Sequence, residues 1–246
     1  MNGNIALIAA LPGELRPLVN HKTAKAWRPC PAPTGVELWE YAHSAGRWIA
    51  VCAGIGADRA TAAFNAAERH APIDAVCSVG WAGSLDAQFR PGNVVSASLV
   101  VDAQTGERYQ VEHWVEGMPI LVSTNAVAGA TEKARLAATY GAGIVDMEAA
   151  TVARLARAKG IPLYVMKAIS DAVDARLPDF AGFMDEAGQL RMPRFLAHVA
   201  VRPAMWASLL RLGRHSSKAA ENLAESLYDW LDERAYIRST SDGDPG

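Results

Sequence analysis

One stretch, residues 143–174, constrains the fold more than any other part of the chain. Within it, strong helix formers and apolar residues at helical spacing predict a helix over 149–159, which Gly160 ends. The mostly apolar run 161–168 then predicts a buried strand. A helix followed at once by a buried strand is typical of an α/β sheet that helices cover on its faces.

Two carboxylates stand at the two ends of this unit: Glu148 opens the helix and Asp171 closes the strand. In an open α/β sheet, ligands bind outside the carboxyl ends of the strands. A sugar with vicinal hydroxyls needs a carboxylate acceptor, and a departing heterocycle needs a proton donor, so the unit can supply both. Ordinary structural roles stay open, since Asp171 could cap a helix and Glu148 could interact with a helix dipole.

The rest of the chain continues the alternation of strands and helices. It predicts a single α/β domain of three α/β/α layers with a mixed central sheet, followed by C-terminal helices. We assign 1–200 to the α/β domain, 201–238 to a helical extension of it and 239–246 to a polar, disordered tail. The predicted strands include 4–11, 36–41, 47–53, 75–79 and 120–123, and the predicted helices include 57–70 and 131–139.

Composition narrows the classes of function. A chain of 246 residues that is 50% hydrophobic and 20% charged suits one compact domain, and a net charge of −2 gives no basic excess for a nucleic-acid partner. Three widely spaced cysteines and six scattered histidines form no metal-ligand pattern, so no metal is expected. The start of the chain lacks a basic signal-peptide region, and no apolar run reaches about 18 residues, so we expect a cytoplasmic protein.

Two glycine-rich segments follow apolar strands: Gly54-x-Gly56 and Gly80-x-x-Gly83. Glycine lets the backbone approach a ligand closely and leaves N–H groups available to an anion or a sugar oxygen. Taken alone, each segment is more commonly a plain tight turn. Beside the two carboxylates, they become candidates for a ligand site.

The segments VDMEAATVA and KAISDAVD resemble the motifs of the nucleoside phosphorylase/nucleosidase superfamily. That family includes purine nucleoside phosphorylases, uridine phosphorylases and methylthioadenosine/S-adenosylhomocysteine nucleosidases. IALIAALPGELRPL, CAGIGADRATAA and SVGWAGSLD extend the resemblance over residues 5–174. It implies an enzyme that cleaves N-glycosidic bonds, with no cofactor apart from phosphate as co-substrate in a phosphorylase. It also implies a homo-oligomer, a dimer or a hexamer, in which a neighbour completes the site.

The resemblance assigns roles to three acids. Asp171 would protonate or hydrogen-bond N7 of a purine, and Glu148 would accept hydrogen bonds from the ribose hydroxyls near the developing positive charge. Glu14 would activate the attacking water, the alternative being a solvated turn residue. The predicted substrate-binding set is Gly56, Gly80, Trp81, Ala82, Val127, Met147 and Ser170. Of these, Met147 would pack against the ribose.

This chain departs from the family at two places that bear on the reaction. Phosphorylases place an arginine just before the glycine turn, whereas here Ser78 and Val79 precede Gly80, and Trp81 replaces the turn serine. Together with Glu14, this favours water over phosphate, although Arg16, Arg59 or a neighbouring subunit could supply a cation. Val127 stands where nucleosidases carry an aromatic residue that stacks on the base. A phosphorylase and a non-catalytic nucleoside-binding module remain the alternatives.

The C-terminal region suggests a subfamily. RPAMWASLLRLGRHSSKAAENLAESL resembles the tail of hopanoid-associated members, which implies adenosylhopane, a lipid-linked adenosine, as substrate. Residues 203–218 could then form an amphipathic surface for peripheral membrane contact, the alternative being a helix packed on the sheet or on a second subunit. Candidates for a widened 5′ pocket are Trp114, Phe180, Phe183 and Met184.

Overall fold

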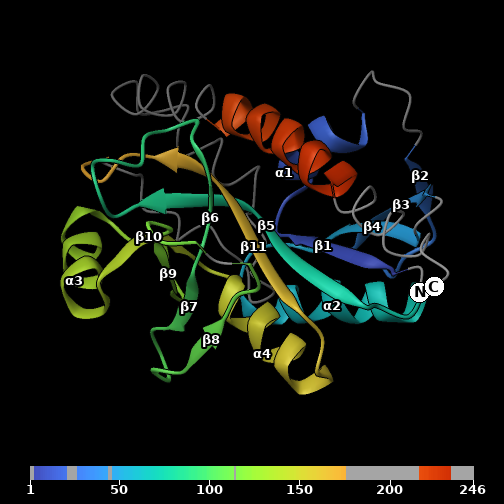
Figure 1. Cartoon of the computed structure of the whole chain (residues 1–246), viewed down its shortest axis with the longest axis horizontal. Helices are drawn as coiled ribbons and strands as arrows, with labels where there is room; N and C mark the ends of the chain where they lie inside the picture. The colour runs from blue at the N-terminus through green and yellow to red at the C-terminus, as the bar shows by residue number, and fades with distance from the viewer. Residues whose placement is uncertain (1–2, 21–26, 44–45, 114, 176–215, 234–246) are drawn as a thin grey trace, which may run out of the picture.

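The computed structural model describes residues 3–20, 27–43, 46–113, 115–175 and 216–233. Its three layers confirm the predicted α/β/α class (Figure 1). Helices α2 (Ala57–His70) and α4 (Ala149–Lys159) cover one face of the sheet. On the other face lie α1 (Pro12–Val19) and a C-terminal helix over 216–233. Helix α3 (Ala130–Tyr140) packs near one end of the sheet.

The described strands form one mixed sheet in the order β2-β3-β4-β1-β5-β10-β9-β7-β8, with β11 paired to β5 and β6. The longest strand, β5, is the centre of this arrangement because β1, β10 and β11 all pair with it. The bounds are β1 (Ile5–Ala9), β2 (Arg28–Cys30), β3 (Glu37–His43), β4 (Gly46–Cys52), β5 (Ala75–Ser84), β6 (Val94–Ser96), β7 (Leu99–Asp102), β8 (Arg108–Gln110), β9 (Ile120–Ser123), β10 (Ala142–Asp146) and β11 (Leu163–Asp171).

The sheet divides along one side of β5. Parallel strand β1 pairs with Ala75–Ser78, and antiparallel strand β10 pairs only with Gly83 and Ser84. Between them, over residues 79–82, no described strand lies on this side of β5. On its other side, β11 pairs with β5 without this gap. The division leaves room at the carboxyl end of β1, where open α/β sheets bind ligands.

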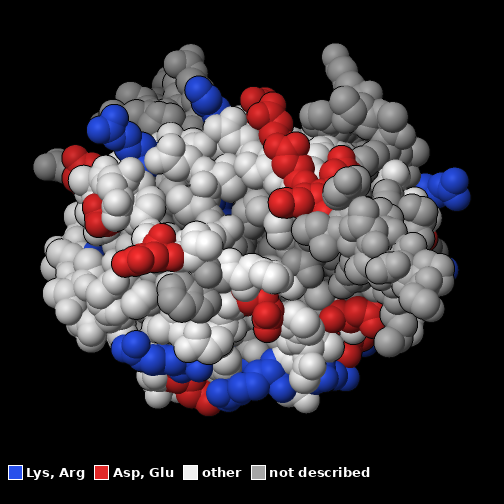
Figure 2. Space-filling view, in the orientation of Figure 1, with Lys and Arg blue, Asp and Glu red and all other residues white. Residues whose placement is uncertain are grey.

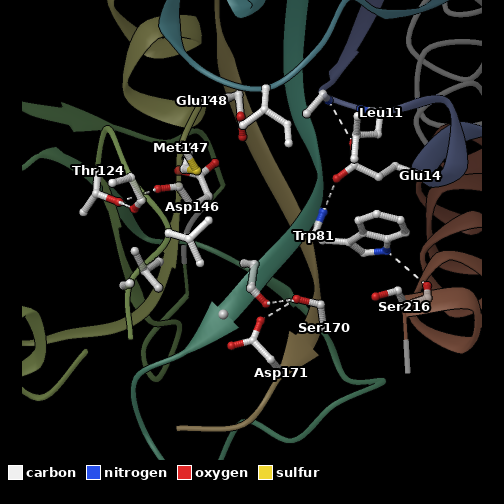
Figure 3. A pocket seen from close by; sticks show the side chains of 18 of the residues that line it. Leu11, Glu14, Trp81, Thr124, Asp146, Met147, Glu148, Ser170, Asp171 and Ser216 are labelled. Atoms are coloured by element: carbon white, nitrogen blue, oxygen red, sulfur yellow. Dashed lines mark hydrogen bonds between the residues drawn. The ribbon is translucent and has the colours of Figure 1, made fainter. Parts of the chain in front are cut away.

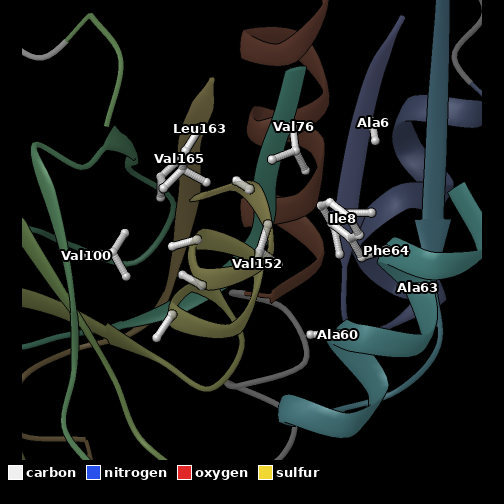
Figure 4. Packing of buried hydrophobic residues seen from close by; sticks show 14 of the residues in the cluster. Ala6, Ile8, Ala60, Ala63, Phe64, Val76, Val100, Val152, Leu163 and Val165 are labelled. Carbon is white, nitrogen blue, oxygen red and sulfur yellow. The ribbon is translucent and has the colours of Figure 1, made fainter. Parts of the chain in front are cut away.

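Each face of the sheet is held by its own apolar cluster. On one face, Val152 of α4 and Phe64 of α2 pack with Ile8 of β1 (Figure 4). On the other face, Leu18 of α1 and Leu227 of the C-terminal helix pack over the sheet and are fully buried. Burial of apolar area on both faces explains why the inner strands are apolar at nearly every position.

Several predicted elements are confirmed at their bounds: α2, β9 and α4 span 57–70, 120–123 and 149–159. Gly160 ends α4 with a φ of 66°, a left-handed conformation that glycine adopts without strain. Residues 28–30, which lie outside every predicted strand, form the short strand β2. Strand β8 was not predicted either; both are short and lie outside the apolar runs that the pattern detects.

The predicted turn at Gly80–Gly83 is wrong, because these residues continue β5 as far as Ser84. Gly80 nevertheless has a φ of 118°, which few other residues could adopt. A helix-capping role for Asp171 is not seen either, because this residue ends β11 and no helix begins over 172–175. Predictions for 176–215, for Trp114 and for the tail 239–246 fall outside the described residues.

The C-terminal helix is joined to α1 by Tyr228. Its hydroxyl accepts a hydrogen bond from Trp27 Nε1 (3.0 Å) and donates one to the carbonyl of Leu18 (2.5 Å). The opposite face of the helix is acidic, as a line of carboxylates over it shows (Figure 2). Basic side chains of α4 gather at the lower edge of the same view. The described residues include no helix long and apolar enough to cross a membrane.

We expect Tyr228→Phe to lower the free energy of unfolding by about 1–3 kcal/mol, because it leaves a buried indole N–H and a carbonyl without this partner. Chemical denaturation followed by tryptophan fluorescence measures the change. Tyr140→Phe is the matched control: its hydroxyl donates to Ala103 O over 3.3 Å at a half-buried position, so its effect should stay near about 0.5 kcal/mol. Equal effects of the two variants would contradict the predicted role of Tyr228.

Candidate active site

A cavity of about 320 Å³ opens where the sheet divides (Figure 3). It collects residues from the end of β1, the start of α1, the middle of β5, the β10–α4 junction, α3 and the end of β11. Its lining is Ala10, Leu11, Glu14, Ile55, Trp81, Ala82, Gly83, Thr124, Ala126, Val127, Ala128, Lys133, Val145, Asp146, Met147, Glu148, Ser170, Asp171 and Ser216. The predicted acids Glu14, Glu148 and Asp171 therefore meet in one place.

Glu14 occupies the gap in the sheet. One of its carboxylate oxygens accepts hydrogen bonds from the backbone N–H groups of Ala10 (2.9 Å) and Leu11 (2.7 Å), and the other accepts from Trp81 N–H (2.7 Å). The side chain is buried, which corrects the alternative of a solvated turn residue. Burial raises the pKa of Glu14 above its usual value, although the backbone donors and the charge of Lys167 oppose this rise.

Gly80 makes room for that carboxylate. A Cβ at this position would lie 2.6 Å from Glu14 Oε1, closer than atoms can approach. Gly80 is not among the residues that line the cavity, and its close neighbour is the Glu14 carboxylate; its contact with substrate stays a prediction. Gly56 is similar, because it lies outside the lining and its N–H donates to Glu148 Oε1 (2.7 Å).

Beneath the cavity lies a buried ion pair between Lys167 of β11 and Asp146 of β10, with 2.9 Å between Nζ and Oδ2. The ammonium also donates to Val79 O (3.1 Å). Burial lowers the pKa of Lys167, but the charges of Asp146, Glu148 and Glu14 raise it by more, so the lysine stays charged. The pair thus places one fixed positive charge close to both glutamates.

Asp146 also fixes the start of α4. Its carboxylate accepts from Ser123 Oγ (2.5 Å) and from the backbone N–H of Ala149 (3.0 Å), and Ser123 Oγ accepts in turn from Ala150 N–H (2.9 Å). These contacts satisfy N–H groups at the helix N-terminus, which have no partner within the helix. They hold Met147 and Glu148 at the wall of the cavity.

Glu148 has a carboxyl group whose pKa is strongly raised. Burial, and then the charge of Asp146, raise its pKa to about 8, while Lys167 and the Gly56 N–H oppose the rise. A carboxyl with this balance is neutral in the empty cavity near pH 7. A ligand that brings hydroxyl donors or positive charge would favour its ionised form.

Asp171 ends β11 with both oxygens occupied. Ser170 Oγ donates to Oδ1 (2.7 Å), and the ammonium of Lys133 from α3 donates to Oδ2. Lys133 Nζ also donates to Ala172 O (2.7 Å). Both side chains line the cavity, and the lysine is 1% exposed.

The remaining predicted residues form the apolar part of the wall. Met147, Ala82 and Val127 line the cavity, and Val127 is 41% exposed. The Trp81 indole lies against Gly13 and donates from Nε1 to Ser216 O (3.1 Å), which joins the cavity to the C-terminal helix. Trp81 therefore contributes an apolar side chain to the cavity wall.

Three functional side chains escaped sequence analysis: Lys133, Asp146 and Lys167. The sequence did contain a signal for Lys167, because this lysine lies inside an apolar run that predicts a buried strand. A buried lysine is almost always paired, so its position implies a partner. Asp146 stood beside the Met-Glu motif but was given no role. No sequence pattern singles out Lys133, because a lysine in an amphipathic helix is normally exposed to solvent.

No group of three or more His, Cys, Asp or Glu side chains suited to a metal ion occurs within the described part of the chain. The model of the Phosphorylase superfamily matches residues 4–119 and 115–199. The chain belongs to this superfamily. The expected family is thereby confirmed, and with it, at the level of the family, an enzyme that cleaves N-glycosyl bonds. A search of curated proteins found no match.

Solved structures share the fold of this superfamily member at low sequence identity. Futalosine hydrolase of Helicobacter pylori has 17% identity and a TM-score of 0.69, with 95% of this chain and 99% of that chain covered. The Helicobacter pylori 5′-methylthioadenosine/S-adenosyl homocysteine nucleosidase has 16% identity and a TM-score of 0.69, with 94% and 99% covered. Arabidopsis thaliana 5′-methylthioadenosine nucleosidase has 17% identity and a TM-score of 0.70, with 94% and 95% covered.

The raised pKa of Glu148 predicts a pH dependence of stability. The unfolded chain loses this proton near pH 4.5 and the folded chain near pH 8, so wild-type stability falls between these values as pH rises. Glu148→Gln removes the titration, and the variant should gain stability relative to wild type by up to about 1.4 kcal/mol per pH unit from pH 5 to 8. Urea denaturation at several pH values measures the difference.

Glu132→Gln is the control for this series. Arg135 donates hydrogen bonds to this exposed carboxylate and lowers its pKa, so both folded and unfolded states are ionised above pH 5. The difference in the free energy of unfolding between Glu132→Gln and wild type should therefore stay constant from pH 5 to 8. A constant difference for Glu148→Gln as well would show that Glu148 is already ionised in the folded protein.

Proposed function

We propose that this protein hydrolyses the N-glycosidic bond of a purine nucleoside, and that its substrate is a 5′-modified adenosine. The observation that carries the proposal is the meeting of Glu14, Glu148 and Asp171 around one apolar cavity (Figure 3). Cleavage of this bond needs three things at once: a nucleophile, stabilisation of a cation-like sugar, and neutralisation of the departing base.

Each acid matches one of these needs. Glu14 is held by three backbone N–H groups at the cavity wall, and its ionised form can take a proton from an attacking water. Glu148 can accept hydrogen bonds from ribose hydroxyls, and positive charge on the sugar would favour its carboxylate form. Asp171, at the end of β11, can hold a proton at N7 of the purine.

The charges around the cavity favour water over phosphate as nucleophile. Among the described residues, no arginine lines the cavity. The two buried lysines already pair with carboxylates, Lys167 with Asp146 and Lys133 with Asp171. A phosphate dianion would therefore meet Glu14 and Glu148 without a free cation to balance its charge. A phosphorylase remains the second candidate, because a neighbouring subunit could add an arginine.

The 5′ substituent is the finer part of the proposal. Two of the structural neighbours are by name nucleosidases of 5′-methylthioadenosine, an adenosine modified at its 5′ position. The cavity wall contributed by Leu11, Ile55 and Trp81 is apolar, which suits an apolar 5′ group. The resemblance of residues 202–227 to hopanoid-associated members makes adenosylhopane our specific candidate.

The first test is release of adenine from adenosine, 5′-methylthioadenosine and a lipid-linked adenosine, each with and without phosphate. We expect release from a 5′-modified substrate at a rate that phosphate does not change, with free ribose derivative as the second product. A ribose 1-phosphate product would establish the phosphorylase instead. Absence of adenine release from all three substrates would favour the non-catalytic nucleoside-binding module.

The second test replaces Glu14, the residue proposed to take a proton from the attacking water. Glu14→Gln should lower kcat by about 10²–10⁴-fold with little change in KM, because the amide keeps the shape but cannot take a proton. Glu68→Gln is the control, since this carboxylate pairs with Lys159 on the surface and should leave kcat unchanged. Full activity of Glu14→Gln would exclude Glu14 as the base.

A further inference from the structure

We propose that Lys133 is the proton source of the leaving-group site: its ammonium passes a proton to Asp171, which hands it to the departing base. This inference rests on the proposed function, since it concerns the same cavity. It adds a residue on α3, remote in sequence from every motif of the site. Lys133 acts through Asp171 and is therefore a positioning and proton-supplying residue.

The need for such a residue follows from the hydrogen bonds of Asp171. Its Oδ1 accepts from Ser170 and its Oδ2 accepts from Lys133, so both oxygens act as hydrogen-bond acceptors. An ionised carboxylate has no proton to give to a purine nitrogen. Of its two donors, the lysine ammonium is far more acidic than the serine hydroxyl, and it already donates to Oδ2.

The surroundings suit the pair both before and after a proton transfer. Ser170 Oγ lies 2.7 Å from Asp171 Oδ1 and 3.3 Å from Ala82 O, and its single proton can point to either oxygen. When Asp171 carries the proton on Oδ2, Oδ1 is a carbonyl oxygen that can still accept from the serine, and the hydroxyl can also turn to Ala82 O. Lys133 keeps Ala172 O (2.7 Å) as a partner in both states. The transfer then requires no side-chain movement.

The fold also brings the two groups together in a way that admits little water. Lys133 is 1% exposed and the Asp171 side chain 9% exposed. Gly83 of β5 makes the approach possible, because a Cβ there would lie 3.0 Å from Asp171 Oδ2 and 3.3 Å from Lys133 Cε. In such surroundings an ion pair and its neutral form differ less in free energy than they do in water.

The ammonium of Lys133 first gives its proton to the Asp171 carboxylate and becomes a neutral amine. The bond between C1′ and N9 then breaks and its electron pair enters the purine, whose N7 takes this proton from the Asp171 carboxyl. Asp171 thereby returns to the carboxylate. The water oxygen bonds to C1′ and its proton goes to Glu14. Exchange with solvent then returns one proton to Lys133 and removes one from Glu14.

The experiment compares two leaving groups in wild type and in Lys133→Met. A purine nucleoside identified by the adenine-release assay needs a proton on its base, whereas 4-nitrophenyl β-D-ribofuranoside releases a stable anion and needs none. We expect Lys133→Met to slow purine release by about 10²-fold or more and nitrophenol release by less than about threefold. Lys159→Met, which breaks a lysine–carboxylate pair on the surface, should change neither rate.

The pH profile separates proton supply from a merely structural role. In Lys133→Met, Asp171 must take its proton from solvent, so the ratio of variant to wild-type purine rates should rise as pH falls from 8 to 5. The other titratable groups that line the cavity are Glu14, Asp146 and Glu148, with Lys167 behind them. Because the variant and wild type share these groups, their effects cancel in the ratio of the two rates. For the nitrophenyl riboside, the ratio should stay constant.

The outcomes decide the inference separately from the proposed function. If wild type releases no base, the proposed function fails and this inference with it. Two results with an active wild type would overturn only the role of Lys133. In one, Lys133→Met cleaves the purine substrate at a rate within threefold of wild type; in the other, the variant loses activity toward the purine and the nitrophenyl substrate equally at all pH values. Circular dichroism verifies folding, and Lys133→Gln replaces the variant if the methionine does not fold.

A measurement on the unmodified protein covers the case in which neither variant folds. The ratio of purine to nitrophenyl cleavage by wild type should fall at alkaline pH, because only purine release consumes the proton of the Lys133 ammonium. A ratio that stays constant through that range would contradict proton supply by a lysine.

Discussion

The carboxylate of Glu14 replaces a strand at the place where the central sheet divides. Strand β1 leaves β5 after Ser78 and β10 joins it only at Gly83, so backbone N–H groups at this place would otherwise be buried without partners. Glu14 accepts three of them. Unpaired buried donors are costly, and this side chain allows the sheet to open around a cavity rather than close over it.

The buried charges of the cavity form two lysine–carboxylate pairs with different surroundings. Lys167 and Asp146 lie in the centre of the sheet and influence both glutamates, whereas Lys133 and Asp171 lie at its edge beside α3. Buried pairs of this kind contribute little stability compared with apolar side chains of the same volume. We therefore interpret both pairs as arrangements for chemistry: one sets the protonation of the glutamates and the other holds the proton for the leaving group.

The fold was largely predictable because its main elements are marked by strong local patterns. Helix α4, its stop at Gly160 and the apolar strand β11 follow from periodicity and from glycine alone. Helix α1 has no such pattern, because Pro12 and Gly13 favour a turn, yet proline is tolerated in the first turn of a helix and Glu14 is held there by the sheet. The short strands β2 and β8 depend on pairing with neighbours and carry no pattern of their own.

The sequence by itself determined the three-layer class, the family, and the three acids at the strand ends, because motif spacing and hydrophobic periodicity are local properties. Only the tertiary structure decided what surrounds those acids. The pairing of Asp171 with Lys133 joins residues 38 positions apart, and that of Glu14 with Trp81 joins residues 67 apart. Burial and neighbouring charge set the protonation of such groups, and both depend on how distant segments pack, which no local pattern of residues records.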